Sequence, residues 1–193
     1  MTVKRCDNAS VGVIITGPQG LLMFDRNTFP VGVAPVAGHV FDDHAGYTEA
    51  ACAEVTEELG LTVASLELVT GGWRPNRCRR AAGPRGIGHQ WQVFNATVTG
   101  TLAPSARETR NARWIAGEEL QSLSAWTSYY ARSVAGVVPK PYQVSAQEFA
   151  ARPGIEPVWV QWLTDAGAIR CSAADLAVID DLAASLTPEV GAA

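Results

Sequence analysis

Short apolar stretches separated by turn residues predict a series of strands in the first two thirds of the chain. Residues 9–15 predict one strand and residues 21–25 its hairpin partner, because the intervening sequence TGPQG is typical of a turn. Strand-like residues recur over 62–73, and the stretch 89–101 alternates imperfectly and is the longest strand candidate. We therefore expect a sheet that begins with an N-terminal hairpin.

A helix predicted at about 46–59 carries three carboxylates on one face. Glu54, Glu57 and Glu58 are spaced i, i+3 and i+4, which brings their side chains within roughly 5 to 6 Å of each other. There is no Lys or Arg between residues 41 and 73, so this is not the mixed-sign surface typical of a solvated helix. The acidic stripe favours a divalent cation that offsets the repulsion, and a solvated acidic face is the alternative.

The stretch 38–61, GHVFDDHAGYTEAACAEVTEELGL, resembles the Nudix box, the signature of the Nudix hydrolase family. Its second half follows the family pattern from Glu54 to the end, but Ala53 occupies the position of an arginine. In the first half His44 occupies the position of a glutamate, and the interval from Gly38 to Glu54 is one residue longer than in the pattern.

These two departures remove charged groups that, in the family, help to fix the loop and orient the metal-binding carboxylates. Asp42, Asp43 and His44 are the candidates to take over part of that role. The helix stop at Gly60 is retained. The properties that the departures affect are the rate of catalysis and the affinity for metal.

The resemblance implies an α+β Nudix fold, in which a mixed β-sheet is sandwiched between helices. We expect a Nudix domain at residues 1–125 and a helical C-terminal extension at residues 126–193. The family function is hydrolysis of a diphosphate bond in a nucleoside diphosphate linked to another moiety, with Mg²⁺ or Mn²⁺ as cofactor.

Several residues of the chain receive roles from this resemblance. The implied metal ligands are Glu54, Glu57 and Glu58, one of which doubles as general base, together with the backbone carbonyl of Gly38. Glu108 precedes an Arg-Trp strand and a Glu-Glu-Leu helix that also resemble the family, and it is a further candidate metal ligand or general base. The ordinary alternative for Glu108 is a surface carboxylate paired with a neighbouring arginine.

An arginine-rich loop is predicted between the strand candidates at 62–73 and 89–101. The segment 74–85 contains no acidic residue, and its Pro and Gly content is typical of a loop. Arginine presents a planar fork suited to phosphate oxygens, so this loop is a candidate clamp for a diphosphate. A solvated loop or a subunit contact is an equal alternative. Its five arginines are Arg74, Arg77, Arg79, Arg80 and Arg85.

The last third of the chain has helical patterns outside the resemblance. Ser145 and Ser172 each begin a capping-box pattern, and apolar residues recur at helical spacing over 176–186. We expect these helices to pack on the core. Shaping the substrate pocket and forming a homodimer contact stay open as further roles, and residues 191–193 are expected to fray.

Composition narrows the function further. A net charge of −4 argues against a general nucleic-acid or membrane-surface binder. No apolar run approaches the roughly 20 residues that span a bilayer, and the N-terminus lacks the apolar length of a secretory signal. We therefore expect a cytoplasmic protein that acts on a small nucleoside diphosphate derivative.

The cysteines add no motif. They are scattered, without a Cys-x-x-Cys pair, and are most simply free thiols in a reducing compartment. A zinc site combining Cys78 with His89 is conceivable, but two further ligands are not evident from the sequence.

Two other functions compete with hydrolysis. The changes at Ala53 and His44 favour a catalytically impaired Nudix-fold protein that binds nucleotides or regulates, whereas the three retained glutamates favour an enzyme. A diphosphate isomerase, which some relatives are, is less consistent because no cysteine lies in a context that supports it. The sequence does not identify the nucleotide or the leaving group.

Overall fold

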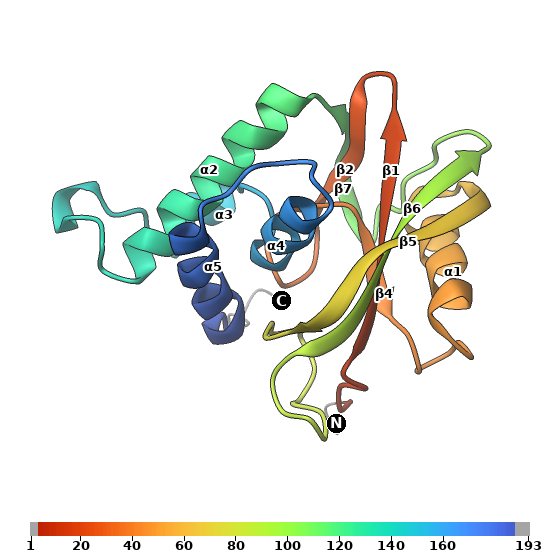
Figure 1. Cartoon of the computed structure of the whole chain (residues 1–193), viewed down its shortest axis with the longest axis horizontal. Coiled ribbons are helices and arrows are strands. Elements are labelled where there is room, and N and C mark those ends of the chain that lie inside the picture. The colour runs from red at the N-terminus through yellow and green to blue at the C-terminus, as the bar shows by residue number, and fades with distance from the viewer. Residues whose placement is uncertain (1–3, 188–193) are drawn as a thin grey trace.

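A mixed β-sheet lies between one helix on one face and a group of helices on the other (Figure 1). The computed structural model describes residues 4–187, so the C-terminal residues expected to fray lie outside the described part. The strands are β1 (Ala9–Gly17), β2 (Gly20–Arg26), β3 (Val33–Ala34), β4 (Val36–His39), β5 (Thr62–Arg74), β6 (His89–Thr99) and β7 (Thr109–Ile115). The helices are α1 (Tyr47–Leu59), α2 (Gly117–Val134), α3 (Ala146–Ala151), α4 (Pro157–Asp165) and α5 (Ala173–Ser185), with a 3₁₀ turn at Lys140–Tyr142. The predicted α+β class and mixed sheet are confirmed.

Strand β1 is the centre of the sheet. It pairs in parallel with β6 along Ala9–Ile15, and its other edge is shared by two antiparallel partners. β4 pairs with residues 10–13 of β1, whereas β2 pairs only with Thr16 and Gly17. Strand β7 then pairs with β2, and β5 with β6. The chain leaves β4 directly into the loop that precedes α1, so the central strand fixes the start of the Nudix-like segment.

Helix α1 packs on one face of the sheet through its apolar side. Ala51, Val55 and Leu59 are buried against alternate residues of β1, including Val11 and Val13. The helix ends as predicted, because Gly60 adopts a left-handed φ of 68° and donates its backbone N–H to the Thr56 carbonyl. The glutamate stripe borders this apolar side, since Glu58 is buried as well, whereas Glu57 is exposed.

The helices of the C-terminal extension pack on the opposite face. Residues of α2, α4 and α5 form one buried cluster with Ile14 and Trp91 of the sheet. Trp159 of α4 lies over β1 where the strand has Gly12, and a Cβ at that position would be 2.6 Å from the Trp159 ring. The domain boundary expected after residue 125 falls inside α2, so this helix belongs to both parts of the chain.

The predicted helix caps of the extension are present. Ser145 and Glu148 form a reciprocal capping box at the start of α3, and the Ser172 side chain accepts from the backbone N–H of Asp175 at the start of α5.

Within residues 4–187, no helix combines the length and the apolar character needed to cross a membrane.

Candidate active site

Three carboxylates meet beside α1. Glu54 and Glu58 lie one turn apart on the helix, and Glu108 comes from the loop that leads into β7. One oxygen from each lies within 4.8 Å of the others. Glu57 is exposed and lines the same cavity, but it is not a member of this cluster. Of the predicted carboxylates, the structure thus brings together Glu54, Glu58 and Glu108.

The loop before β7 holds Glu108 beside α1, because its backbone N–H groups bind carbonyls in the last turn of the helix. The backbone N–H groups of Ala103 and Ser105 donate to the carbonyls of Leu59 and Glu58, each at 2.9 Å. The backbone carbonyl of Glu108 accepts from Asn27, just after β2, at 3.0 Å. Glu108 is therefore held from two sides, by α1 and by the end of β2.

Strand β4 lies against the two helix carboxylates. The backbone N–H of Ala37 donates to Glu58 Oε2 at 3.2 Å. A Cβ on Gly38 would overlap the carboxylate of Glu54, so any other residue here would displace that side chain from its place in the cluster. Metal binding by the Gly38 carbonyl stays a prediction.

Burial dominates the electrostatics of the cluster. The pKa of Glu54 is raised to about 7, chiefly by burial and also by the charges of Glu57 and Glu108. Burial also raises the pKa of Glu58, which is only 4% exposed, well above its ordinary value. The positive charge of Arg26 opposes both shifts. These carboxylates are costly to keep ionised without further positive charge.

A cavity of about 340 Å³ opens onto the cluster. It lies between α1, the loop from β5 to β6, and the start of α4. Its charged lining contains both signs, with Asp42, Asp43, Glu54, Glu57, Glu58, Glu108 and Glu156 against Arg26, Arg77, Arg79, Arg80 and Arg107.

The structure divides the five predicted arginines into two groups. Arg77, Arg79 and Arg80 line the cavity. Arg74 instead pairs with Asp165 at 2.7 Å, and Arg85 stacks on Trp73 with its guanidinium carbon 4.1 Å from the ring centre; neither is among the residues that line the cavity. Phosphate binding by Arg74 and Arg85 stays a prediction, and both have structural contacts of their own.

Two charged residues of the cavity have no counterpart in the sequence analysis. Arg26 ends β2, and its Nη1 lies 3.4 Å from Oε2 of Glu156, the residue before α4. Burial raises the pKa of Glu156, and Arg26 opposes the shift. No local spacing connects these residues, since one follows an apolar strand and the other precedes a helix of the extension. The C-terminal extension thus contributes a carboxylate to the cavity.

The substituted positions of the box have ordinary surroundings. Ala53 is half-buried on α1, and His44 lines the cavity without a hydrogen bond that the described residues supply. Asp42 is bound to Lys4 at 3.1 Å and to Arg80, so it faces the arginine loop. The positive charge of Arg26 acts on both Glu54 and Glu58, and that of Arg80 acts on Glu54; neither arginine belongs to α1, where the arginine of the box is missing.

A mixed sheet between helices, with a carboxylate cluster on the helix of the box, defines a Nudix-type protein. The family model for the NUDIX domain matches residues 7–135, about two thirds of the chain. The chain therefore belongs to the Nudix hydrolase family.

Solved structures with a similar chain trace come from several microorganisms. A MutT Nudix hydrolase from Burkholderia pseudomallei is 18% identical, covers 60% of this chain and 86% of its own, and has a TM-score of 0.49. A MutT protein from Methanosarcina mazei Go1 is 19% identical, with coverages of 63% and 85% and a TM-score of 0.48. A Nudix-family hydrolase from Clostridium perfringens is 20% identical, with coverages of 60% and 85% and a TM-score of 0.48. None of the curated proteins compared with the chain matches it. The family assignment rests on the domain match.

Proposed function

We propose that this protein is a divalent-metal-dependent hydrolase that cleaves a diphosphate bond in a nucleoside diphosphate linked to another moiety. The observation that carries the proposal is the meeting of opposite charges in one cavity. A carboxylate cluster occupies one wall, and three arginines of the loop between β5 and β6 occupy another. A metal-bound diphosphate needs both, because the carboxylates hold the cation and the guanidinium groups bind phosphate oxygens.

The donor set fits Mg²⁺ or Mn²⁺. Glu54, Glu58 and Glu108 offer carboxylate oxygens, which are the ligands that these cations prefer, and the three groups are near enough to bind together. Glu57, at the exposed edge, is proposed to bind the cation through water or to contact substrate. When bound, the cation supplies positive charge for the diphosphate and lowers the pKa of a bound water.

The other charged residues of the cavity are proposed to bind phosphate, to neutralise the carboxylates and to accept a proton. Arg77, Arg79 and Arg80 are proposed to bind the phosphate groups, and Arg26 is proposed to supply the positive charge that the box lacks at Ala53. Glu108 pairs with Arg107 at 2.5 Å in the described structure. In our proposal Glu108 takes a proton from the attacking water, which requires that pair to loosen when substrate binds.

A catalytically impaired nucleotide-binding or regulatory protein is the second candidate. Ala53 favours it, because the arginine of the box is absent from α1. The buried cluster of three carboxylates favours the enzyme, since a binding protein gains little from acidic groups that cost free energy to bury.

Metal-dependent turnover tests the proposal. Purified protein would be assayed with Mg²⁺ or Mn²⁺ against nucleoside triphosphates, dinucleoside polyphosphates and nucleotide sugars, with phosphate-product analysis. We expect Glu58→Gln and Glu54→Gln each to lower kcat by at least about 100-fold, the loss expected when a group that stabilises the transition state is removed. Glu67→Gln, at an exposed carboxylate on β5, is the matched control and should turn over normally.

The two candidates give different results. Cleavage that needs a divalent cation and is lost in Glu58→Gln supports the hydrolase. Tight nucleotide binding without cleavage of any compound supports the binding protein, and normal turnover by Glu58→Gln overturns the metal-ligand assignment.

A further inference from the structure

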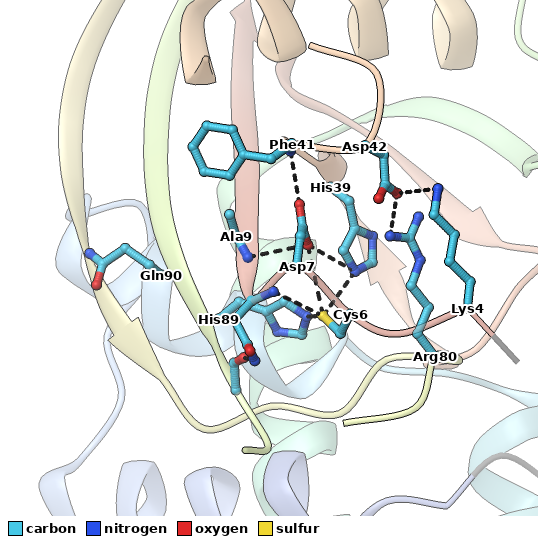
Figure 2. Close-up of polar contacts among 12 residues, drawn as sticks. Lys4, Cys6, Asp7, Ala9, His39, Phe41, Asp42, Arg80, His89 and Gln90 are labelled. Carbon is cyan, nitrogen blue, oxygen red and sulfur yellow. Dashed lines mark hydrogen bonds and ion pairs between the residues drawn. The ribbon is translucent and has the colours of Figure 1, made fainter. Parts of the chain in front are cut away.

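A second group of metal-ligand side chains lies outside the carboxylate cluster. Cys6, His39, Cys78 and His89 each place one ligand atom within 4.8 Å of the others. They come from four separate segments: the stretch before β1, the end of β4, the arginine loop, and the start of β6. Figure 2 shows the sulfur of Cys6 between the rings of His39 and His89. The sequence indicated only Cys78 and His89, and the fold supplies the other pair.

The spacing of these atoms is close to that of a tetrahedral zinc site. Zinc–sulfur bonds of about 2.3 Å and zinc–nitrogen bonds of about 2.0 Å place ligand atoms roughly 3.5 Å apart for S···N and roughly 3.8 Å apart for S···S. Cys6 Sγ lies 3.5 Å from His39 Nε2 and 3.0 Å from His89 Nε2. The side chains therefore need to shift by less than about 1 Å to enclose an ion.

The hydrogen bonds of His89 leave its inner nitrogen free to bind a metal. Trp91 donates its indole N–H to Asn76 Oδ1 at 3.2 Å, which identifies that atom as an acceptor. His89 Nδ1 lies 2.9 Å from the same oxygen, so Nδ1 carries the proton. The lone pair of Nε2 then points at Cys6. A metal-binding histidine commonly has such an outer partner, and His89, Asn76 and Trp91 are all buried.

The surroundings of Cys6 and His39 include a carboxylate. Asp7 Oδ1 lies 4.0 Å from His39 Nε2, the nitrogen that faces Cys6, so Asp7 borders the site on its inner side. Asp7 is itself held by the backbone N–H groups of Ala9 and Phe41 (Figure 2). The backbone N–H of Asn8 donates to Cys6 Sγ at 3.3 Å. Such a contact suits a thiolate, the form of cysteine that binds metals.

We propose that Cys6, His39, Cys78 and His89 bind a structural zinc ion, distinct from the cation of the carboxylate cluster. Sulfur and imidazole ligands select zinc, whereas carboxylate oxygens select magnesium or manganese. Two thiolates neutralise the charge of Zn²⁺, which suits a largely buried position. Four protein ligands leave no open coordination position, so the ion is structural and takes no part in the reaction.

The ion would fix the arginine loop. Cys78 lies between two arginines that line the active-site cavity, and the backbone N–H of Cys6 donates to Ala81 in the same loop at 2.9 Å. Zinc would add a stronger connection between this loop, the N-terminal segment and two strands of the sheet. The proposed zinc site thus determines where the arginines lie relative to the carboxylates.

The test is the metal content and spectrum of the full chain. We expect protein purified without chelators to contain one zinc per chain. Replacement by Co²⁺ should give the intense ligand-field bands of a tetrahedral site and a thiolate-to-cobalt charge-transfer band. Cys78→Ser and His89→Gln should lose most of the bound zinc, whereas Cys52→Ser and Cys171→Ser, at the two other thiols, should keep it.

The wild-type spectrum decides the question even if the ligand variants fail to fold. Folded wild type that retains no stoichiometric Zn²⁺ or Co²⁺ after desalting, or that binds Co²⁺ without a thiolate band, overturns the proposal. Glu58→Gln separates this site from the catalytic proposal, because it should keep the cobalt–thiolate spectrum whether or not the wild type hydrolyses nucleotides. Loss of that spectrum in Glu58→Gln, with the fold intact by circular dichroism, would also contradict a separate site.

Discussion

Arg26 and Asn76 show how single residues outside the Nudix box prepare the two candidate metal sites. Arg26 acts on three carboxylates, Glu54, Glu58 and Glu156, and its positive charge offsets part of the rise in pKa that burial causes in each. Asn76 accepts from Trp91 and from His89, and so fixes which nitrogen of His89 faces the cysteines. Both residues act by orienting or neutralising other side chains. No sequence pattern therefore marks either of them as part of a metal site.

Asn76 gives a prediction at this scale. We expect Asn76→Ala to weaken zinc binding by roughly 10- to 100-fold, because loss of the outer partner frees the His89 tautomer and ring orientation. Asn76→Asp should restore the affinity, since a carboxylate accepts the same two N–H groups. Competition titration with a chromophoric chelator measures the effect. Equal zinc affinity in all three proteins would show that Asn76 does not position the ligand.

The site residues that could be predicted from the sequence are those defined by local spacing. Glu54 and Glu58 follow from the helical period, but the same period could not decide that Glu57 lies outside the cluster. Cys6 and His39 are 33 residues apart and belong to different strands or their flanks, so only the paired sheet reveals that they meet. Residues that one helix turn brings together are predictable, and residues that strand pairing brings together are not.

Two loops on the rim of the active site are joined to one another. Asp42, in the loop before α1, binds Arg80 of the arginine loop and Lys4 near the N-terminus. Burial raises the pKa of Asp42, but the hydrogen bonds from Lys4 and Arg80 lower it by more, so its pKa lies below the ordinary value. The loop before α1 and the arginine loop therefore depend on each other for their positions.

This ion pair predicts a pH dependence of stability. We expect Asp42→Asn to lower the free energy of unfolding by about 1–3 kcal/mol at pH 7, because a largely buried, charged hydrogen bond is weakened. The folded pKa is depressed, so the contribution is complete above the unfolded pKa of about 3.9 and is lost as the pH falls through the folded value.

Urea unfolding of wild type and Asp42→Asn between pH 3 and 7 measures this difference. Asp43→Asn, at the adjacent exposed carboxylate, is the matched control and should unfold like the wild type. A difference between Asp42→Asn and wild type that stays constant over the whole range would contradict the ion-pair origin.

The elements themselves were largely predictable, for a physical reason. Strand and helix patterns are local, so the hairpin at the start, the box helix and its stop at Gly60 all follow from short stretches of sequence. The pairing of β1 with β6 and the packing of α4 on β1 depend on contacts between distant segments, which the pattern does not contain.

Across the whole molecule, the C-terminal extension completes the core and reaches the active site. A path of aromatic contacts runs from α4 into the sheet, with the Trp91 ring centre 6.0 Å from those of both Trp159 and Trp162. Trp91 in turn donates to Asn76 beside the proposed zinc site, and Glu156 extends from the start of α4 into the cavity. The extension is therefore part of the same folding unit as the Nudix core.

Trp159 tests this view. It is fully buried, and we expect Trp159→Ala to lower the free energy of unfolding by about 3–5 kcal/mol, the usual cost of the cavity left by a large aromatic side chain. Tyr142→Ala, at a side chain that is 69% exposed, is the control and should change stability little. Chemical unfolding followed by fluorescence and by circular dichroism measures both. A cost below about 1 kcal/mol for Trp159→Ala would show that the extension packs weakly on the sheet.

The contact between Gly12 and Trp159 also bears on how such a sequence can change over time. Filling a strand glycine is usually a simple route to a more stable sheet, but here any side chain at position 12 would occupy the space of the indole ring. The side chains at positions 12 and 159 share one space of fixed volume. Among relatives that share this extension, we expect a larger residue at position 12 to accompany a smaller one at position 159, so that the two positions covary.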